Sequence, residues 1–294
     1  VKHLLGMIDK RRMSALKKVV DISKFKKESG IFLVSDIPGE QISFPDEGYD
    51  ACFGVEDNSF WFSHRNRCII SAIKKYCPNC IFFDVGGGNG YVSQGLQKEG
   101  IETVLVEPGL KGCLNARKRK VENILNMTCD KVDFKTEKQE LAFGFFDVIE
   151  HIENDYRFLD EIFQRVPSGT KFFITVPAYN WLWSQDDIVA GHHRRYNKSS
   201  LTNLTSKLGM KLVFSTYFFS FLPLPIFLLR RLPFLFNRPL SLEQAEKKVG
   251  SDHSAGDSAI KKAVISALRF EQLGIEKGIS LPFGGSLLHI VEKV

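Results

Sequence analysis

Short apolar runs alternate with segments of helical periodicity through the middle of the chain. Runs rich in Ile, Val and Phe predict buried strands, and apolar residues three and four positions apart predict helices that cover them. This alternation is typical of βαβ units built around a parallel sheet. The predicted strands are Ile81–Val85, Thr103–Glu107, Asn123–Met127, Leu141–Phe146, Lys171–Val176 and Lys211–Phe219, and the predicted helices are Asn89–Glu99, Leu110–Lys118, Asp155–Val166 and Lys198–Leu208.

The pattern divides the chain into a core and its additions. Residues 1–57 have weak periodicity and many turn formers, so we interpret them as a loosely built N-terminal lead-in. Residues 58–219 hold the alternating elements and form the predicted core. Residues 220–282 are a predicted insertion, apolar at first and then helical at Leu242–Val249 and Ala259–Glu276. Residues 283–294 return to the core, because Ser286–Val294 has the pattern of a last strand.

Composition narrows the class of protein only slightly. Of the 294 residues, 44% are hydrophobic and 25% are charged, as in ordinary globular proteins. The net charge of +6 is spread along the chain, which argues against a nucleic-acid partner. Cys77 and Cys80 form a single CxxC pair, so we expect neither a metal site nor a disulfide framework. With no signal peptide in view, a cytoplasmic location is predicted.

A glycine-rich turn, DVGGGNG over Asp84–Gly90, follows the first predicted strand. Glycines let the backbone approach a ligand closely, and the next helix offers its N-terminal amides. The dinucleotide fingerprint GxGxxG is not met, since its third glycine would fall at Tyr91 or Ser93. This departure argues against one class of protein that binds nucleotides at such a turn, the nicotinamide-dependent oxidoreductases.

An acidic residue, Glu107, ends the second predicted strand within the segment VLVEP, about 20 residues after the turn. A carboxylate at this distance can accept hydrogen bonds from ribose hydroxyls. By itself, Glu107 is better explained as a solvated residue at a strand end. Combined with the glycine turn, it favours a nucleotide-like cofactor. Another possible class is a cofactor-binding scaffold without turnover. Loss of the glycine turn or of Glu107 would indicate such a scaffold, and this sequence has both.

These two segments resemble the first two motifs of the class I S-adenosylmethionine-dependent methyltransferases. FDVIEHIEND (Phe146–Asp155) resembles the family segment beside the transferred methyl group. SFWFSHRN (Ser59–Asn66) and VPAYNWLWSQDDIVAGHHRRY (Val176–Tyr196) resemble a bacterial small-molecule subfamily. The resemblance implies a doubly wound, mostly parallel α/β sheet of seven strands, with Ser286–Val294 inserted antiparallel beside the sixth. It implies methyl transfer from S-adenosylmethionine to an acceptor that the sequence does not name.

The resemblance also implies site residues. The expected cofactor-binding residues are Asp84, Gly86, Gly88, Asn89, Gly90, Glu107, Pro108, Asp130 and Asp147, with Asp133 competing with Asp130 for adenine. His151, His192 and His193 are the expected catalytic residues, because a histidine near its usual pKa can take a proton from an acceptor. Trp61, Arg65, Trp181 and Arg194 are expected on the substrate side. The alternatives are that the tryptophans belong to the core, that the histidine–arginine loop is structural, and that Glu150 is exposed.

The insertion has two interpretations. Its beginning, Phe218–Leu229, is apolar but too short for a membrane span of about 20 residues, and Pro223 and Pro225 interrupt it. Apolar residues then alternate with arginines, which suits a segment in a bilayer interface. One interpretation is therefore a lid or membrane-facing arm for a small-molecule or lipid-linked acceptor, in a protein peripheral to the inner face of the membrane. The other is plain core. The arginines are Arg230, Arg231 and Arg238, and the apolar residues are Leu232, Phe234, Leu235 and Phe236.

Overall fold

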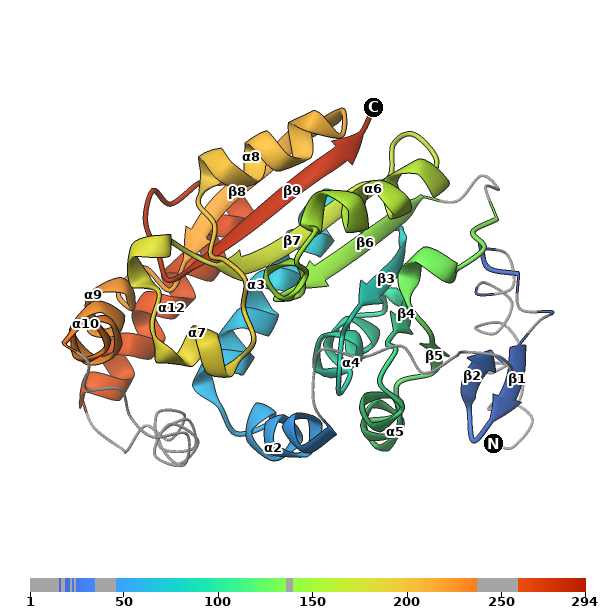
Figure 1. The fold of residues 1–294 in the computed structure, drawn as a ribbon, viewed down its shortest axis with the longest axis horizontal. Helices are drawn as coiled ribbons and strands as arrows, with labels where there is room; N and C mark the ends of the chain where they lie inside the picture. The colour runs from blue at the N-terminus through green and yellow to red at the C-terminus, as the bar shows by residue number, and fades with distance from the viewer. Residues whose placement is uncertain are drawn as a thin grey trace.

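A single mixed sheet organises the described part of the molecule (Figure 1). The structure is a computed structural model that describes residues 25–34, 46–135, 140–236 and 259–294, with residues 16, 19–21 and 23 before them. Within these residues, nine strands lie in the order β1-β2-β5-β4-β3-β6-β7-β9-β8. Their bounds are β1 Phe25–Glu28, β2 Ile31–Val34, β3 Ile81–Val85, β4 Glu102–Val106, β5 Asn123–Asn126, β6 Leu141–Phe146, β7 Lys171–Pro177, β8 Met210–Phe218 and β9 Ser286–Lys293.

The seven strands β3 to β9 form the predicted doubly wound sheet. Five of them, β5-β4-β3-β6-β7, pair in parallel, and β9 lies antiparallel between β7 and β8. The prediction of an antiparallel last strand beside the sixth is confirmed. The sequence did not predict the hairpin β1–β2, which extends the sheet when β2 pairs with β5 in parallel. The lead-in therefore contributes two ordered strands to the sheet.

Helices cover both faces of the sheet (Figure 1). On one face, α6 and α8 pack over side chains such as Phe83, Phe143 and Phe172. On the other face, α3, α4 and α12 pack over Phe82, Phe173 and their neighbours, and α5 packs over β4 and β5. Because both faces are covered, the central strands are apolar at successive positions, as in other parallel sheets. The helix bounds are α2 Asp46–Glu56, α3 Phe60–Tyr76, α4 Tyr91–Lys98, α5 Leu110–Lys118, α6 Asp155–Arg165, α7 Gln185–Val189, α8 Lys198–Lys207, α9 Pro223–Ile226, α10 Leu232–Leu235 and α12 Ala259–Lys277.

The long helix α3 was not predicted from periodicity. It begins because the Ser59 hydroxyl accepts hydrogen bonds from the amides of Trp61 and Phe62, at 3.2 and 3.4 Å. These bonds satisfy amides that the first turn of a helix leaves without partners. The helix therefore starts at the segment that resembles the bacterial subfamily, and it carries Trp61 and Arg65 toward the carboxyl edge of the sheet.

Between β8 and β9 the chain forms α9, a π-helical turn η4 (Phe227–Arg231), α10 and α12. The predicted helix Leu242–Val249 and Arg238 lie outside the described residues. Within the described part of the chain, no helix is long and apolar enough to cross a membrane. Figure 1 shows α9 and α10 at one end of the molecule, with β1 and β2 at the other.

A buried carboxylate, Glu271 of α12, joins the insertion to the core. It pairs with the His64 ring at 3.0 Å. It also accepts hydrogen bonds from the Phe219 amide at 2.8 Å and from the Ser220 amide at 2.7 Å. The net effect of these partners is to hold the pKa of Glu271 below its usual value, although burial opposes the shift. This one side chain therefore ties α12, α3 and the end of β8 together.

A second buried polar side chain, His289, lies on β9. Its ring nitrogens lie 3.1 Å from the Ser215 hydroxyl and 3.3 Å from the Thr205 hydroxyl. Burial lowers the pKa of His289 to about 4, with a smaller contribution from Lys198. The ring is therefore neutral at physiological pH and belongs to the packing of β9 against β8 and α8.

Candidate active site

The glycine turn and Glu107 meet at the carboxyl edge of the sheet, after β3 and β4. One carboxylate oxygen of Glu107 accepts a hydrogen bond from the Gly88 amide at 2.8 Å. The other accepts from the Gly109 amide at 2.7 Å and from the Tyr49 hydroxyl at 2.8 Å. Burial raises the pKa of Glu107, and these three hydrogen bonds oppose the rise. Glu107 is thus a buried acceptor directly beside the turn.

The turn needs glycine at two positions for different reasons. Gly90 has a φ of 71°, and a Cβ there would lie 2.8 Å from the Ala116 Cβ and 2.9 Å from a methyl of Val121. It is therefore required by the approach of α5 as well as by its backbone conformation. Gly88 has a φ of 53°, and a Cβ there would meet only the Tyr49 ring at 3.9 Å. The backbone at Gly88 therefore faces open space.

That open space is a cavity of about 270 Å³. The predicted site residues that line it are Gly86, Gly88, Asn89, Glu107, Pro108, Asp147 and His151. The lining residues that sequence reasoning missed are Tyr49, Cys52, Glu56, Val85, Val106, Met127, Thr128, Cys129, Val148, Ile152 and Phe158. We call this space the first cavity. Some of these missed residues lie at or just after the ends of predicted strands. The rule that ligands bind at the carboxyl ends of parallel strands could have identified them.

Three expected cofactor-binding residues do not line the first cavity. Asp84 is fully buried, and it accepts hydrogen bonds from the Ser93 amide at 3.1 Å and the Ser93 hydroxyl at 2.6 Å. Burial raises the pKa of Asp84 to about 6. It joins β3 to α4 beneath the turn. Gly90 packs against α5, and Asp130 lies in the turn Cys129–Lys131, whose neighbours Thr128 and Cys129 line the cavity instead. Their role toward the cofactor stays a prediction.

Helix α2 closes one side of the first cavity. The side-chain amide of Asn89 donates to the Tyr49 carbonyl at 2.8 Å, and the side-chain amide of Asn115 donates to the Asn89 side-chain oxygen at 3.1 Å. Arg119 pairs with Glu56 and lies over the ring of Phe53. No signal in the sequence marked α2 as part of the site, because its contacts are to residues more than thirty positions away along the chain.

An ion pair stands at the end of β6. Asp147 has a φ of 57°, a strained backbone position for a residue with a side chain. Its carboxylate lies 2.6 Å from the Arg65 guanidinium and accepts a hydrogen bond from the Thr175 hydroxyl at 3.1 Å. Arg65 also donates to the Phe146 carbonyl at 2.7 Å and lies 5.6 Å from the Trp61 ring centre. The predicted residues Arg65, Asp147 and Trp61 therefore form one connected group.

Beside this pair, Glu150, His151 and His192 come together. Glu150 is fully buried, so the expectation that it is exposed is wrong. The cause is the loop after α7, which covers the turn and whose His193 amide donates to the Glu150 carbonyl at 2.7 Å. Burial, and then the charge of Asp147, raises the pKa of Glu150 well above its usual value.

The two histidine rings of this group face each other. Their centres lie 4.8 Å apart, and the Nδ1 of His192 lies 2.9 Å from the Asp187 carboxylate. Burial, and then the neighbouring His192, lowers the pKa of His151 to about 4. His151 is therefore neutral at physiological pH and a weaker base than an ordinary histidine, which differs from the expectation of a pKa near its usual value.

The remaining predicted residues lie away from the first cavity. His193 is exposed, and its backbone amide makes the contact with Glu150 described above. Arg194 donates to the Ile152 and Glu153 carbonyls at 3.1 and 2.6 Å, so it ties its loop to the turn after β6. Trp181 is 45% exposed and packs among aromatic side chains such as Phe283. Their catalytic or substrate roles stay predictions.

A second cavity, of about 490 Å³, lies on the other side of these groups. The charged side chains that line it form ion pairs with one another. Asp187 pairs with Arg195, and Asp186 pairs with Arg230 at 2.8 Å. Its lining residues are Phe60, Trp61, Phe62, Pro177, Asp186, Asp187, Ala190, His192, Arg195, Leu222, Pro225, Ile226, Leu229, Arg230, Gly285 and Ser286.

A polar wall stands between the two cavities. We use this name for Arg65, Asp147, Glu150, His151 and His192. His151 lines the first cavity and His192 lines the second, with their rings in contact. Asp147 lines the first cavity, and its partner Arg65 contacts Trp61, which lines the second. A ligand in the first cavity therefore meets Asp147 and His151, and a ligand in the second cavity meets His192, on opposite sides of the wall.

Residues 78–214 match the family model described as a methyltransferase domain. The match spans the glycine turn, Glu107 and most of the polar wall, and the last strand lies antiparallel beside β8, as the resemblance implied. This part of the chain therefore resembles a methyltransferase domain, and the fold is one that solved S-adenosylmethionine-dependent methyltransferases share. No curated protein sequence matches it.

Solved structures share its fold at low sequence identity. One is the plantazolicin methyltransferase in complex with a triazolic desmethylPZN analogue and SAH, at 13% identity and a TM-score of 0.50. The alignment covers 85% of this chain and 92% of that one. Another is phosphoethanolamine N-methyltransferase 2 of Haemonchus contortus, with phosphomonomethylethanolamine and S-adenosylhomocysteine, at 14% identity and a TM-score of 0.51. There the alignment covers 86% of this chain and 59% of that one.

Proposed function

We propose that S-adenosylmethionine binds in the first cavity and that the methyl acceptor binds in the second, so that methyl transfer takes place at the polar wall. The observation that carries this proposal is the placement of the wall, which is reached from both cavities. In a sheet of this kind, ligands bind at the carboxyl ends of the strands near the topological switch point. The first cavity lies there, between β3, β4 and β6.

Two features of the first cavity suit the cofactor, the open backbone at Gly88 and the acceptor Glu107. A Cβ at Gly88 would meet little protein, so the backbone there is open to a ligand. Glu107 is a buried carboxylate that accepts three hydrogen bonds, and a carboxylate has about four acceptor positions. A ribose hydroxyl can use the remaining position or replace the Tyr49 hydroxyl. We assign the ribose to Glu107 and the methionine half to the backbone of Gly86 and Gly88.

The cofactor, when bound, supplies a methyl group already activated by a positively charged sulfur. The work left to the protein is therefore mainly alignment of acceptor, methyl and sulfur, which can contribute about 7–11 kcal/mol. Asp147 and Arg65 hold each other at the end of β6 and give the wall a fixed geometry.

Calorimetric titration of the purified protein tests the cofactor site. S-adenosylhomocysteine should bind with one site per chain, and NAD should not bind, because the glycine turn lacks the dinucleotide fingerprint. Binding of NAD in preference to S-adenosylhomocysteine would contradict the assignment.

The acceptor that the second cavity favours is apolar. Apart from its internally paired polar side, the cavity is lined by residues such as Trp61, Leu222, Ile226 and Leu229. The solved structures named above hold small molecules, and this supports a small-molecule acceptor here as well. Incubation of a cell extract with methyl-labelled S-adenosylmethionine, followed by partition between organic solvent and water, tests this. Label in the organic phase is expected, and label confined to the aqueous phase would contradict an apolar acceptor.

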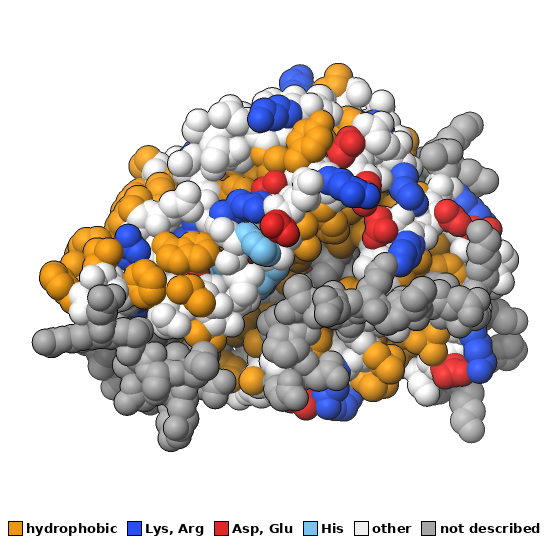
Figure 2. Space-filling view, viewed as in Figure 1, with side chains coloured by type: hydrophobic (Ala, Val, Ile, Leu, Met, Phe, Trp, Pro, Cys, Tyr) orange, Lys and Arg blue, Asp and Glu red, His pale blue; other side chains and the backbone are white. Residues whose placement is uncertain are grey.

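Exposed apolar side chains beside this cavity support the membrane-facing arm. Leu224 is 64% exposed, Leu229 61%, Leu235 51% and Phe236 73%. Figure 2 shows hydrophobic side chains gathered at the end of the molecule where α9 and α10 lie, with basic side chains among them. Side chains of plain core would be buried. We therefore propose that this end contacts a membrane surface and admits a lipid-linked acceptor.

Sedimentation with anionic liposomes at low salt tests the arm. The wild-type chain should sediment with the vesicles, and replacing Phe234, Leu235 and Phe236 with serine should reduce the bound fraction. The matched control replaces Leu110 and Leu114 of α5, which are 51% and 43% exposed but lie away from the arm. If the control loses as much vesicle binding as the arm variant, or if the wild type does not sediment with the vesicles, the membrane-facing arm is ruled out and the segment has only a packing role.

A further inference from the structure

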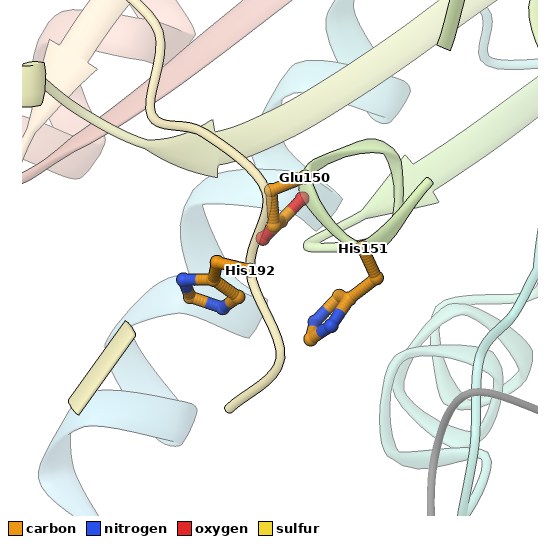
Figure 3. Close-up of side chains that lie close together, drawn as sticks. All are labelled: Glu150, His151 and His192. Carbon is orange, nitrogen blue, oxygen red and sulfur yellow. The ribbon is translucent and has the colours of Figure 1, made fainter. Parts of the chain in front are cut away.

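Three potential metal ligands of the polar wall converge on one point. The ligand atoms of Glu150, His151 and His192 all lie within 4.8 Å of one another. Figure 3 shows Glu150 and His151 on the turn after β6, and His192 on the separate loop that faces them. Two imidazoles and one carboxylate are a ligand set that binds divalent transition ions. The sequence predicted no metal site, because the two segments that carry these ligands lie about forty positions apart along the chain.

The state of Glu150 points independently to a missing partner. Its side chain is fully buried, and neither carboxylate oxygen has a hydrogen-bond partner on another described residue. A buried carboxylate without a partner is costly, so buried carboxylates are generally paired, hydrogen-bonded or bound to a metal. The nearby guanidinium of Arg65 is already paired with Asp147 and the Phe146 carbonyl.

The surroundings of His192 also match those of a metal ligand. Its Nδ1 lies 2.9 Å from the Asp187 carboxylate, which Arg195 holds in place at 2.7 and 2.9 Å. A carboxylate behind a histidine fixes the ring and leaves Nε2 to the ion, and this arrangement accompanies most metal-bound histidines. The hydrogen bond from the His193 amide to the Glu150 carbonyl keeps the two segments in register.

We propose that Glu150, His151 and His192 bind one divalent first-row transition ion, such as Zn²⁺ or Mn²⁺, in the polar wall. With metal–ligand distances of about 2.0–2.2 Å, neighbouring ligand atoms lie about 3–3.5 Å apart, so the three side chains must close by about 1–2 Å. Rotation about side-chain torsions supplies this movement. Three protein ligands leave at least one coordination position open.

The open position gives the ion a role that rests on the proposed function. Because the triad stands between the two cavities, an acceptor oxygen from the second cavity can occupy it. An ion bound to a hydroxyl lowers its pKa, so the hydroxyl loses its proton to solvent. The oxygen then forms the bond to the methyl carbon, and the methyl–sulfur bond breaks with its electron pair on sulfur. The acceptor class is therefore a hydroxyl compound with an apolar body.

Equilibrium dialysis against Zn²⁺ and Mn²⁺, with elemental analysis of the protein, tests the site directly. The wild type should bind one ion per chain. E150Q, H151A and H192A should each bind about 100-fold more weakly, since each loses a direct ligand. H193A is the matched control, because His193 is the next residue and exposed, and its affinity for the ion should stay within about threefold. The Co²⁺-loaded protein should show visible absorption bands that each of the three variants loses.

Thermal unfolding separates a bound ion from a structural role. E150Q keeps the shape of the side chain and removes one direct ligand, so it should abolish the rise in melting temperature that Zn²⁺ causes in the wild type. No ion bound by the wild type, or binding by E150Q and H192A as tight as that of the wild type, would overturn the proposal. Titration with S-adenosylhomocysteine checks the fold of every variant. Ion binding without S-adenosylhomocysteine binding would overturn the proposed function and leave the metal site standing, and the reverse result would overturn only the metal site.

Discussion

Replacing Glu107 with alanine tests the cofactor site most sharply, because this one carboxylate serves both the ligand and the fold. In the ligand-bound protein we assign it hydrogen bonds with ribose hydroxyls. A hydrogen bond to a charged group contributes about 1.5–3 kcal/mol. At about 1.4 kcal/mol per factor of ten, the variant should bind S-adenosylhomocysteine about 10- to 150-fold more weakly.

The same substitution should also lower stability. It removes the acceptor of the buried Gly109 amide and the Tyr49 hydroxyl, at 2.7 and 2.8 Å, while the Gly88 amide faces the cavity, where water can reach it. Each buried donor left without an acceptor costs about 1–3 kcal/mol, so a loss of about 2–6 kcal/mol is expected, offset in part because a buried charge is removed. Thermal shift alone would therefore confuse weaker binding with weaker folding.

Calorimetry below the onset of unfolding, monitored by circular dichroism, separates the two effects. Glu99→Ala is the matched control, because Glu99 pairs with Lys74 on the surface at the far end of α4 and is 44% exposed. It should leave the affinity unchanged. An unchanged affinity in a folded Glu107→Ala variant would refute the assignment of the ribose.

Three further predictions concern the fold. Glu271→Ala should lower the free energy of unfolding by about 1–3 kcal/mol in urea denaturation, because it leaves the buried Phe219 amide without its acceptor, whereas Glu276→Ala on the exposed side of the same helix should change it less. The pKa of His289 is about 4 in the folded protein and about 6.5 in the unfolded chain, so the unfolded chain binds more protons between these pH values. The free energy of unfolding should therefore fall by an amount on the order of 3 kcal/mol as the pH drops from about 6.5 to 4. This pH dependence should be absent in His289→Gln. Gly90→Ala should lower the melting temperature by the equivalent of about 1–3 kcal/mol, because its Cβ would lie 2.8 Å from the Ala116 Cβ; an unchanged melting temperature would contradict the tight packing of α5.

Local patterns predicted the core elements closely. The strands Ile81–Val85 and Leu141–Phe146 and the helix Leu110–Lys118 have the predicted bounds. Each is a run whose burial is decided by its own apolar content, with a glycine or charged residue at its end. The hairpin β1–β2 and the helices α2 and α3 were missed for the opposite reason. Their residues mix apolar and charged side chains, and they are ordered by contacts with the sheet, α5 and α12 rather than by their own periodicity.

The candidate site also has features that the sequence predicted and features that it did not. The glycine turn and Glu107 could be found because their chemistry is written in neighbouring residues and in one regular spacing. The cavity that α2 closes and the contact between His192 and the turn after β6 could not, because they join segments about forty residues apart.

The sequence by itself determined the alternation of strands and helices, the glycine turn and the acidic residue after β4, because apolar periodicity and turn chemistry act over a few neighbouring residues. Only the tertiary structure decided that Glu150 is buried. Whether a charged side chain meets water depends on what another part of the chain lays over it, and here the loop carrying His192 and His193 covers the turn. The same long-range contact brings Glu150, His151 and His192 together between the two cavities.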